Sequence, residues 1–364
     1  MKAKPRRLVL VASTAKTKSL KAMVALLITA LVSPLVLARE AWPNGYRRMK
    51  ALRLAVLVIV LMCLGLSATA VFAVEGGLGR PISGAAIAPY AGLVPPEPGF
   101  ALTLGEAYYD GSISGAVPLG NFNIQLGIDM AVSFTPIAVS YIWPTTSKEW
   151  NFASAVSFPL AYVDVKANAT LGSFSGRVTD HTFGLFDMAF TPLVASYHIS
   201  ETDHVALSVT IWAPTGHYDP DRLATLSLNN WTVIPGLAYT KIFPKQNIEL
   251  TGVWQLQFYT ENPATNYQNG VLSDLEATVI KRFKCGAGIG VVGSWIEQVS
   301  DDSGSTADQF HGFSGRAFGV GPIVTYTTKF GKSLLDLNAR FIPEFGNEKR
   351  VEGNLFQFSA TVKF

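Results

Sequence analysis

Apolar and polar residues alternate along much of the chain, most regularly between residue 99 and the C-terminus. A period of two predicts β-strands whose two faces meet different surroundings. In the segment 249–258 one face carries Leu250, Trp254, Leu256 and Phe258, while the other carries Glu249, Thr251, Gln255 and Gln257, with Val253 as the exception. The segments 205–212, 335–341 and 356–364 alternate in the same way.

The alternating segments are about ten residues long, which fits a tilted strand that crosses a membrane. Turn clusters such as 243–247 and 329–332 separate them. Further candidate strands lie near 100–110, 130–142, 151–165, 182–199, 231–242, 272–283, 286–298 and 317–328. At about 22 residues per strand and loop, we expect about 12 strands, within a range of about 10 to 14, because bacterial barrels carry even numbers.

Three features favour an all-β fold, a transmembrane antiparallel β-barrel, over a soluble β-sandwich. Charged residues make up only 15% of the chain. The last strand ends on Phe364, as is typical of outer-membrane barrels, so we expect lipid contacts and recognition by the outer-membrane assembly machinery of a Gram-negative bacterium. Aromatic residues gather at strand ends, as in an interfacial girdle: Tyr108, Tyr109, Tyr141, Trp143, Trp212, Tyr259 and Tyr326.

The first 73 residues differ from the rest in charge. They hold 12 of the 29 Lys and Arg but one of the 26 Asp and Glu, so the remaining chain carries a net charge of −8 and offers no basic patch for nucleic acid. Two apolar runs, 23–38 and 54–66, resemble secretion signals and are shorter than the roughly 20 residues of a membrane-spanning helix.

Processing signals divide this region further. Val71 and Ala73 occupy the small-residue positions before a signal-peptidase site, which predicts cleavage after Ala73. We interpret 49–73 as a signal peptide and 1–48 as an upstream start misassignment or an extended leader, with a pair of retained membrane helices as the alternative. The sequence leaves open whether Met1 or Met49 is the true start.

Residues 74–98 are rich in Gly and Pro and cannot sustain a strand ladder. They form either a flexible periplasmic leader or a plug folded into the barrel formed by 99–364. The composition slightly favours the leader.

Motifs for catalysis, metals and cofactors find no supporting context. The segment 288–293 matches a dinucleotide fingerprint but continues as a strand. The five His show no ligand spacing, and no GxSxG motif for a nucleophilic Ser occurs. The two Cys, at 63 and 285, allow no disulfide framework. We therefore expect a protein that is not an enzyme and has no cofactor or metal.

Dense polar motifs lie where strands meet loops, around 213–232, 260–270, 298–304, 319–322 and 340–353. Asp219 is expected to cap its loop or pair with Arg222, and Arg340 to pair with Glu344 across the lumen. These motifs either order loops and strand register or line a pore and orient solutes. The candidate binding residues of the lumen or loops are Asp219, Arg222, Asn229, Glu261, Asn262, Arg340, Glu344 and Arg350.

The order of these blocks resembles the phenol meta-pathway degradation-associated outer-membrane proteins, which include the SphA type. The blocks PTGxYDPxRLA, TxENPATxYxxG, GxxG with QxxDDSG, GPxxxY and RxxxEFGxxxRxxG stand in sequence between about residue 99 and residue 364. The resemblance implies an outer-membrane barrel, often named a transporter, linked to catabolism of aromatic or other hydrophobic compounds.

The function expected from these features is passive uptake of small hydrophobic or aromatic solutes through a porin-like barrel. A non-conducting barrel that binds lipid or sphingosine is one alternative, and an outer-membrane hydrolase is another, for which no motif is present. The sequence does not identify the solute or the oligomeric state.

Overall fold

The computed structural model describes residues 79–119, 122–171, 174–304, 307 and 314–364. The chain divides into two units, Met1–Ala70 and Val71–Phe364, and the described residues belong to the second. The expected leader 1–48, the signal peptide 49–73 and residues 74–78 therefore lie outside the described residues. Among the described residues, no helix has the length and apolarity that a membrane span requires.

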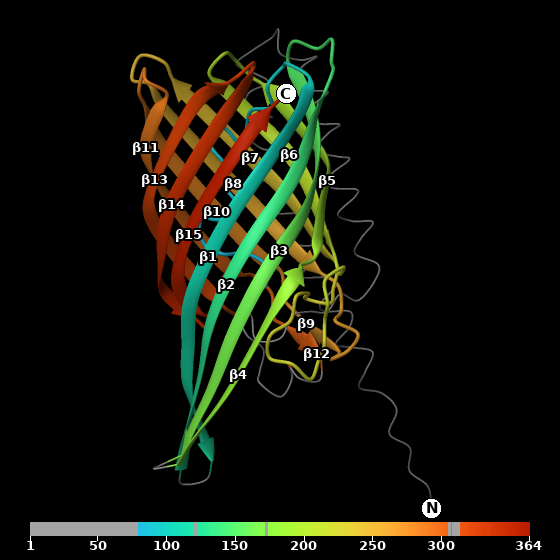
Figure 1. The fold of residues 1–364 in the computed structure, drawn as a ribbon, viewed down its shortest axis with the longest axis vertical. Coiled ribbons are helices and arrows are strands. Elements are labelled where there is room, and N and C mark those ends of the chain that lie inside the picture. The colour runs from blue at the N-terminus through green and yellow to red at the C-terminus, as the bar shows by residue number, and fades with distance from the viewer. Residues whose placement is uncertain (1–78, 120–121, 172–173, 305–306, 308–313) are drawn as a thin grey trace, which may run out of the picture. The chain divides into compact units, whose positions relative to one another are not determined.

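The chain closes into an antiparallel barrel of twelve strands, as the sequence pattern predicts (Figure 1). The sheet contains 13 strands, but β4 and β5 pair with successive parts of the same edge of β3 and so share one position in the wall. The short β9 and β12 form a separate pair outside this sheet. The strands are β1 (Gly99–Leu119), β2 (Phe122–Trp143), β3 (Trp150–Leu171), β4 (Phe174–Leu185), β5 (Met188–His198), β6 (Asp203–Ala213), β7 (Thr232–Phe243), β8 (Ile248–Tyr259), β9 (Tyr267–Gln268), β10 (Leu272–Arg282), β11 (Ala287–Gln298), β12 (Ser303–Gly304), β13 (Arg316–Phe330), β14 (Ser333–Glu348) and β15 (Glu352–Lys363).

The barrel closes where the first strand meets the last. Ala101 of β1 lies opposite Lys363 of β15, and the pairing runs to Ser112 opposite Glu352. The other edge of β1 pairs with β2, so β1 has a neighbour on both sides. Closure removes the unpaired sheet edges that a hydrocarbon environment would penalise.

The wall is interrupted where the sequence predicts one strand over 182–199. β4 pairs with the second half of β3 and ends at Leu185, and β5 then pairs with the first half of β3 from Met188 onward. Phe186 and Asp187 form the junction. β6 pairs with β5 and does not pair with β4. At the junction, loop 214–231 therefore lies where a neighbouring strand would otherwise pair with β4.

The two ends of the barrel differ. One end carries the short connections 199–202, 244–247 and 331–332, and the other carries the long connections 214–231, 260–271, which includes β9, and the one between β11 and β13, which includes β12. Short turns mark the periplasmic end of outer-membrane barrels and long loops the extracellular end. β1 to β4 continue beyond the other strands on the long-loop side (Figure 1).

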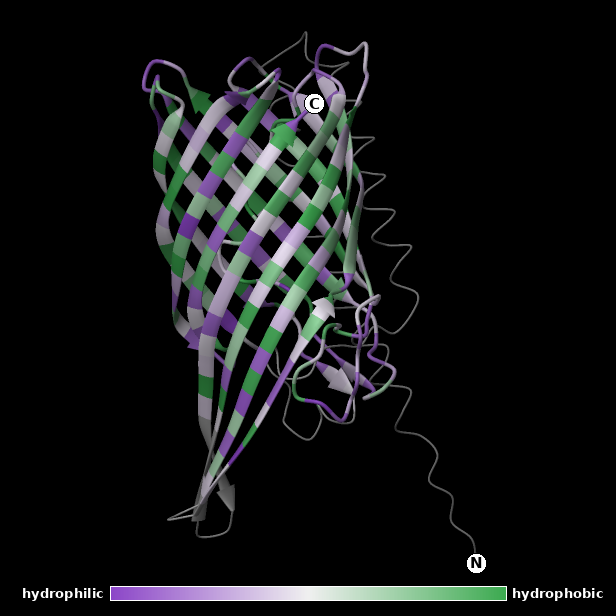
Figure 2. Cartoon of the chain, in the orientation of Figure 1, coloured by the Kyte–Doolittle hydropathy of each residue, from purple (hydrophilic) through white to green (hydrophobic). Residues whose placement is uncertain are grey.

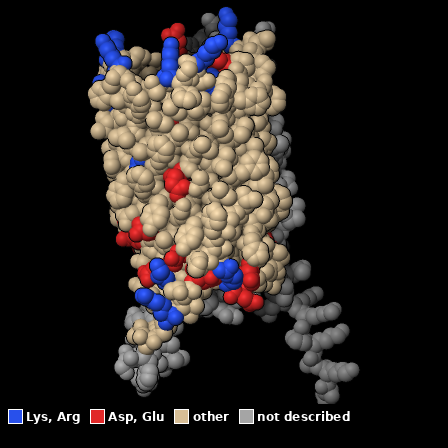
Figure 3. Space-filling model, viewed as in Figure 1, with Lys and Arg blue, Asp and Glu red and all other residues tan. Residues whose placement is uncertain are grey.

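The alternating faces of the strands separate lipid from lumen. Along β10 the buried Leu272, Asp274 and Glu276 alternate with the exposed Leu275 and Ala277. Figure 2 shows the same alternation along the strands of the wall. On the face seen in Figure 3, charged side chains gather mainly near the two ends and leave a largely uncharged belt between them.

Glu106 is an exception on the outer face. It lies opposite the exposed Phe358, and the hydroxyls of Ser133 and Thr135 donate hydrogen bonds to its two carboxylate oxygens, each at 2.5 Å. Two hydroxyl donors therefore replace part of the hydration that this carboxylate loses.

Two lysine substitutions on β15 test the face assignment. Phe358 is 41% exposed on the outer face, whereas its neighbour Ser359 points inward and accepts a hydrogen bond from Asn338. A lysine on the lipid face costs roughly 2–4 kcal/mol at mid-depth. Phe358→Lys is therefore expected to reduce the yield of folded barrel in membranes much more than Ser359→Lys. Equal membrane yields for the two variants would refute the assignment.

The predicted aromatic girdle is correct in part. Tyr108, Trp143 and Tyr326 are 43–48% exposed on the outer face, and Trp143 packs edge-on against Tyr141. Tyr109 and Tyr259 are buried inside the barrel, and the ring of Trp212 contacts the inward Phe134 and Phe186. The prediction failed there because a strand end places alternate residues on opposite faces.

Residues 79–98 are termed here the N-terminal segment; residues 79–95 lie inside the barrel, and Pro96, Glu97 and Pro98 are exposed before β1 begins. Ile87 is 1% exposed and packs in one apolar cluster with buried inward residues from nine strands. The preference for a flexible leader was therefore wrong for these residues. Gly and Pro prevent a strand, but they leave the backbone groups of the segment available to side chains of the wall.

Candidate functional site

Three carboxylates of the inner wall accept backbone N–H groups of the N-terminal segment. Glu276 accepts from Gly84 at 2.8 Å and from Ile87 at 2.7 Å. Glu249 accepts from Tyr90 at 2.6 Å. The third, Glu344, accepts the Ser83 N–H at 3.4 Å and the Ser83 hydroxyl at 2.7 Å. Charge-assisted bonds of this kind are about twice as strong as neutral ones, so they hold the segment firmly.

Two arginines hold the carbonyl groups of the same segment. The Nη1 atom of Arg340 donates to the carbonyl oxygens of Gly84 and Ile87, both at 2.7 Å. Arg350 donates to the Pro81 carbonyl at 2.8 Å. Glu276 and Arg340 thus bind the N–H and C=O groups of one short stretch.

The segment lies close to the wall toward the periplasmic end as well. Gly92 donates to the Thr240 hydroxyl at 3.0 Å and accepts from Ser196 at 2.9 Å. A Cβ at Gly92 would lie 2.6 Å from the Thr240 nitrogen and 2.7 Å from the His204 carbonyl oxygen, so only glycine fits. Asn151 then donates to the Val94 carbonyl at 3.0 Å.

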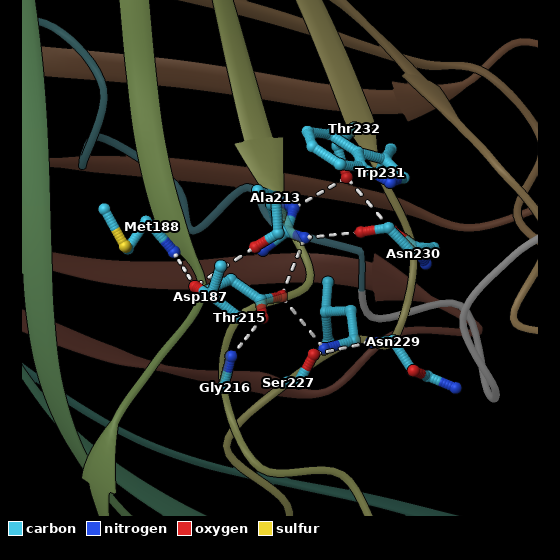
Figure 4. Close-up of polar contacts among 12 residues, drawn as sticks. Asp187, Met188, Ala213, Thr215, Gly216, Ser227, Asn229, Asn230, Trp231 and Thr232 are labelled. Carbon is cyan, nitrogen blue, oxygen red and sulfur yellow. Dashed lines mark hydrogen bonds and ion pairs between the residues drawn. The ribbon is translucent and has the colours of Figure 1, made fainter.

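Arg80 anchors the segment at the junction between β4 and β5. Its guanidinium donates to Asp187 at 2.9 Å and to the Thr232 hydroxyl at 2.7 Å, and it lies 4.8 Å from the ring centre of Trp212. Asp187 is fully buried and also accepts N–H groups of loop 214–231, from Gly216 and Leu228, each at 3.1 Å. Figure 4 shows Asp187, Gly216 and Thr232 converging from separate parts of the chain.

An apolar surface lies on the inner side of this junction. The rings of Phe134, Phe186 and Trp212 contact one another, with centroids 5.6–6.3 Å apart. Leu226 and Ala224 of loop 214–231 continue this surface over β3. The Arg80 guanidinium lies over the rings of Phe186 and Trp212, so the lumen combines this ring cluster and the Arg80–Asp187 pair at the junction with the charged groups of β8, β10 and β14.

The structure places three of the predicted candidates in this site. Arg340, Glu344 and Arg350 are all buried and all contact the N-terminal segment. The predicted pairing of Arg340 with Glu344 was wrong, since no ion pair among the described residues joins them. Both lie on β14, so they face the segment side by side and not across the lumen.

The other candidates lie in the extracellular loops. Asp219 accepts the Asp221 N–H and so caps its loop, as expected. Arg222 pairs with Asp180 of β4 at 2.5 Å instead of Asp219. This hydrogen bond raises the pKa of the Arg222 guanidinium. A pairing with β4 was not foreseen, because the two residues are 42 positions apart.

A small amide network joins two of these loops. Asn229 donates to Asn262 at 2.7 Å, and Asn262 donates to the Tyr218 hydroxyl at 2.9 Å. Asn262 is buried, whereas its neighbour Glu261 is half-buried and donates or accepts no bond of this network. Asn229, Asn262 and Tyr218 therefore order the extracellular loops.

Sequence reasoning missed several residues of the site, including Arg80, Asp187, Glu249, Asp274 and Glu276. Asp274 and Glu276 left a signal, because they alternate with Leu275 and Ala277 in a predicted strand and are acids at inward positions. Arg80 left none, since its role depends on the path of a segment without periodicity.

The chain is similar in sequence to one family. The family model described as "Putative MetA-pathway of phenol degradation" matches residues 110–360. A search of curated protein sequences finds no match.

Solved structures with a similar fold are outer-membrane barrels. The COG4313 outer membrane channel from Pseudomonas putida F1 has a TM-score of 0.54 at 15% identity, over 76% of this chain and 100% of that chain. A FadL homologue from Pseudomonas aeruginosa has a TM-score of 0.41 at 10% identity, over 81% and 98% of the two chains. The fold is that of a barrel of the Gram-negative outer membrane.

Proposed function

Because the chain belongs to the family of the putative MetA-pathway of phenol degradation, we propose that it is an outer-membrane channel for passive uptake of small hydrophobic or aromatic compounds. Neither reaction chemistry nor a cofactor is part of this proposal. Membrane lipid surrounds the barrel, and the C-terminal strand with Phe364 is its contact for the assembly machinery.

The observation that carries the proposal is the combination of rings and charged groups in the lumen. Phe134, Phe186 and Trp212 contribute rings, next to the Arg80 guanidinium, and Glu276 and Arg340 contribute charge elsewhere on the wall. Binding sites for small organic molecules combine apolar walls with a few placed polar groups. Weak contact with such a wall lets a solute enter and leave again.

The N-terminal segment acts in this proposal as a plug. A barrel of eight strands is filled by its own side chains, whereas 16 to 18 strands leave an aqueous channel. Twelve strands lie between these sizes and enclose one extended segment. Solutes then pass either through space beside the plug or through space that opens when the plug moves.

Liposome swelling with matched solutes tests the function. Liposomes containing the full chain are expected to admit small aromatic solutes several-fold faster than empty liposomes, and faster than sugars of similar size. Swelling equal to that of empty liposomes for every solute would instead favour a non-conducting barrel that binds lipid, the second candidate, which the filled lumen also supports.

A further inference from the structure

Three turns at the periplasmic end of the barrel each place an exposed phenylalanine next to an exposed lysine. The turns join β7 to β8, β10 to β11 and β13 to β14. Their phenylalanine rings are 38–66% exposed. An apolar ring beside a cation at a strand end suits the level where hydrocarbon meets charged headgroups. The three pairs are Phe243 with Lys245, Phe283 with Lys284, and Phe330 with Lys332.

Contacts between the strands and turns join these pairs into one surface. β8 pairs with β10, and β11 pairs with β13, so the three turns are neighbours along the rim. The Lys281 ammonium donates to the Gln246 carbonyl of the first turn. The Thr327 N–H donates to the Gly286 carbonyl of the second turn at 2.9 Å. The three pairs and Lys281, termed here the basic patch, therefore extend over six adjacent strands.

Lys281 places a positive charge on the side of the barrel. Along β10 the outward residues are Leu275, Ala277, Val279 and Lys281, so the lysine directly follows an apolar row that faces lipid. The stem of a lysine in this position lies along apolar surface while its ammonium reaches the headgroups. A partner that met only the turns from the periplasm would leave this side chain unused, so its position favours lipid over a periplasmic protein.

The acids near the basic patch face the lumen. Glu249 is buried inside the barrel and pairs with Arg282. Asp336 lies two residues before the inward Asn338 on β14 and accepts the Thr327 hydroxyl at 2.6 Å. Among the described residues, none of the four lysines of the patch forms an ion pair. Their charges are therefore available to an anion outside the barrel.

The outer face carries the opposite charge at its extracellular end. Asp110, Asp129 and Glu352 are exposed there on β1, β2 and β15 and line one hollow, with Lys166 as its single base. Figure 3 shows Lys and Arg side chains at the periplasmic end, at the top of the view. Positive charge on the outer face thus gathers at the leaflet of the outer membrane that consists of phospholipids.

We propose that the basic patch binds the headgroups of anionic phospholipids, such as phosphatidylglycerol, in the periplasmic leaflet. The lysines attract the phosphates, because each lysine close to an anionic membrane surface adds to the attraction. The rings of Phe243, Phe283 and Phe330 pack against the adjoining part of the acyl chains. This surface is separate from the lumen, so the inference does not depend on the proposed uptake of solutes.

The exposed thiol of Cys285 lies in the β10–β11 turn and allows the lipids beside the patch to be measured. A fluorophore is attached to Cys285 in a chain with Cys63→Ser, and the protein is reconstituted in phosphatidylcholine vesicles with a minor fraction of phosphatidylglycerol. Brominated phosphatidylglycerol is expected to quench the fluorophore several-fold more strongly than the same fraction of brominated phosphatidylcholine. Added salt should reduce this difference, because it screens exposed charges.

Neutralising the four lysines together is expected to abolish the preference for phosphatidylglycerol. Arginine at the same four positions should preserve it, because arginine keeps the charge. If the combined glutamine variant does not fold, Lys284→Gln alone, in the same turn as the fluorophore, should lower the preference in part. The four substitutions are Lys245→Gln, Lys281→Gln, Lys284→Gln and Lys332→Gln.

Lys166→Gln together with Lys349→Gln is the control, since both lysines lie at the extracellular end and their loss should leave the preference unchanged. Equal quenching by the two lipids in the unsubstituted patch would overturn the proposal. A preference that survives the four glutamines would also overturn it, because the attraction would then come from other residues. Loss of the preference in inorganic phosphate, but not in chloride of the same ionic strength, would assign the patch to free phosphate instead of lipid.

Discussion

A chain from which residues 80–94 are deleted is expected to form a steadily open channel. In planar bilayers its conductance should exceed that of the full chain several-fold, because the deletion removes the groups that Glu249, Glu276 and Arg340 bind. The barrel should still assemble, since its strands pair without the segment.

The open channel is also expected to prefer cations. Among the buried charges that the structure describes on the inner wall, the deletion takes Arg80 away and leaves five acids against Arg340 and Arg350 and the partly buried Arg282; the acids are Asp187, Glu249, Asp274, Glu276 and Glu344. A lumen of one predominant sign selects the opposite ion. The reversal potential in a salt gradient measures this preference.

Replacing residues 80–94 with a Gly/Ser linker of the same length is the control for the deletion. It keeps the chain length but loses the side chain of Arg80 and the close fit of the segment. An open, noisier channel is expected. If the deletion and the linker both conduct like the full chain, the segment is not what closes the lumen.

Asp187→Ala is expected to be the most destabilising single substitution at the junction of β4 and β5. It leaves the Arg80 guanidinium buried without its partner and frees the N–H groups of Gly216 and Leu228. Removing one partner of a buried pair costs about 3–5 kcal/mol. The loss of stability is measured as a lower midpoint of urea unfolding in lipid vesicles. Folded and unfolded barrels are distinguished by their different migration in gels without heating.

Two variants make this prediction specific. Arg80→Ala together with Asp187→Ala should cost less than the sum of the single substitutions, because the second removes a charge that the first has already orphaned. Asp180→Ala, which breaks the exposed pair with Arg222, should change little, since exposed ion pairs contribute little. Equal losses for Asp180→Ala and Asp187→Ala would show that burial of the pair does not matter.

The barrel was largely predictable from sequence because each wall strand carries its own signal. In 249–258 the inward acid Glu249 and the outward Leu250 already separate lumen from lipid. Strand number follows from the count of such segments and the length of their turns. The interruption at Phe186 was not predictable, since β4 and β5 read as one alternating run.

The site was predictable only where a single strand contains it. Arg340 and Glu344 lie on an alternating strand, and both face the lumen as expected. Their hydrogen-bond partners could not be predicted, because these are mainly backbone groups of the Gly/Pro-rich segment, which no side-chain pattern marks. The prediction of the Arg222 partner failed for a related reason. Asp219 is near in sequence, but the register of β3 and β4 places Asp180 next to Arg222.

The position of the N-terminal segment constrains the order of assembly. Its contacts come from around the whole circumference, from Asn151 of β3 through Glu276 of β10 to Gln357 of β15. The seam that completes the cylinder joins β1, which directly follows the segment, to β15. Either the segment is already in place when this seam forms, or it must be threaded lengthwise through a finished mouth. If the segment is enclosed when β1 pairs with β15, no threading is needed. The lumen is then filled in the same step that closes the barrel.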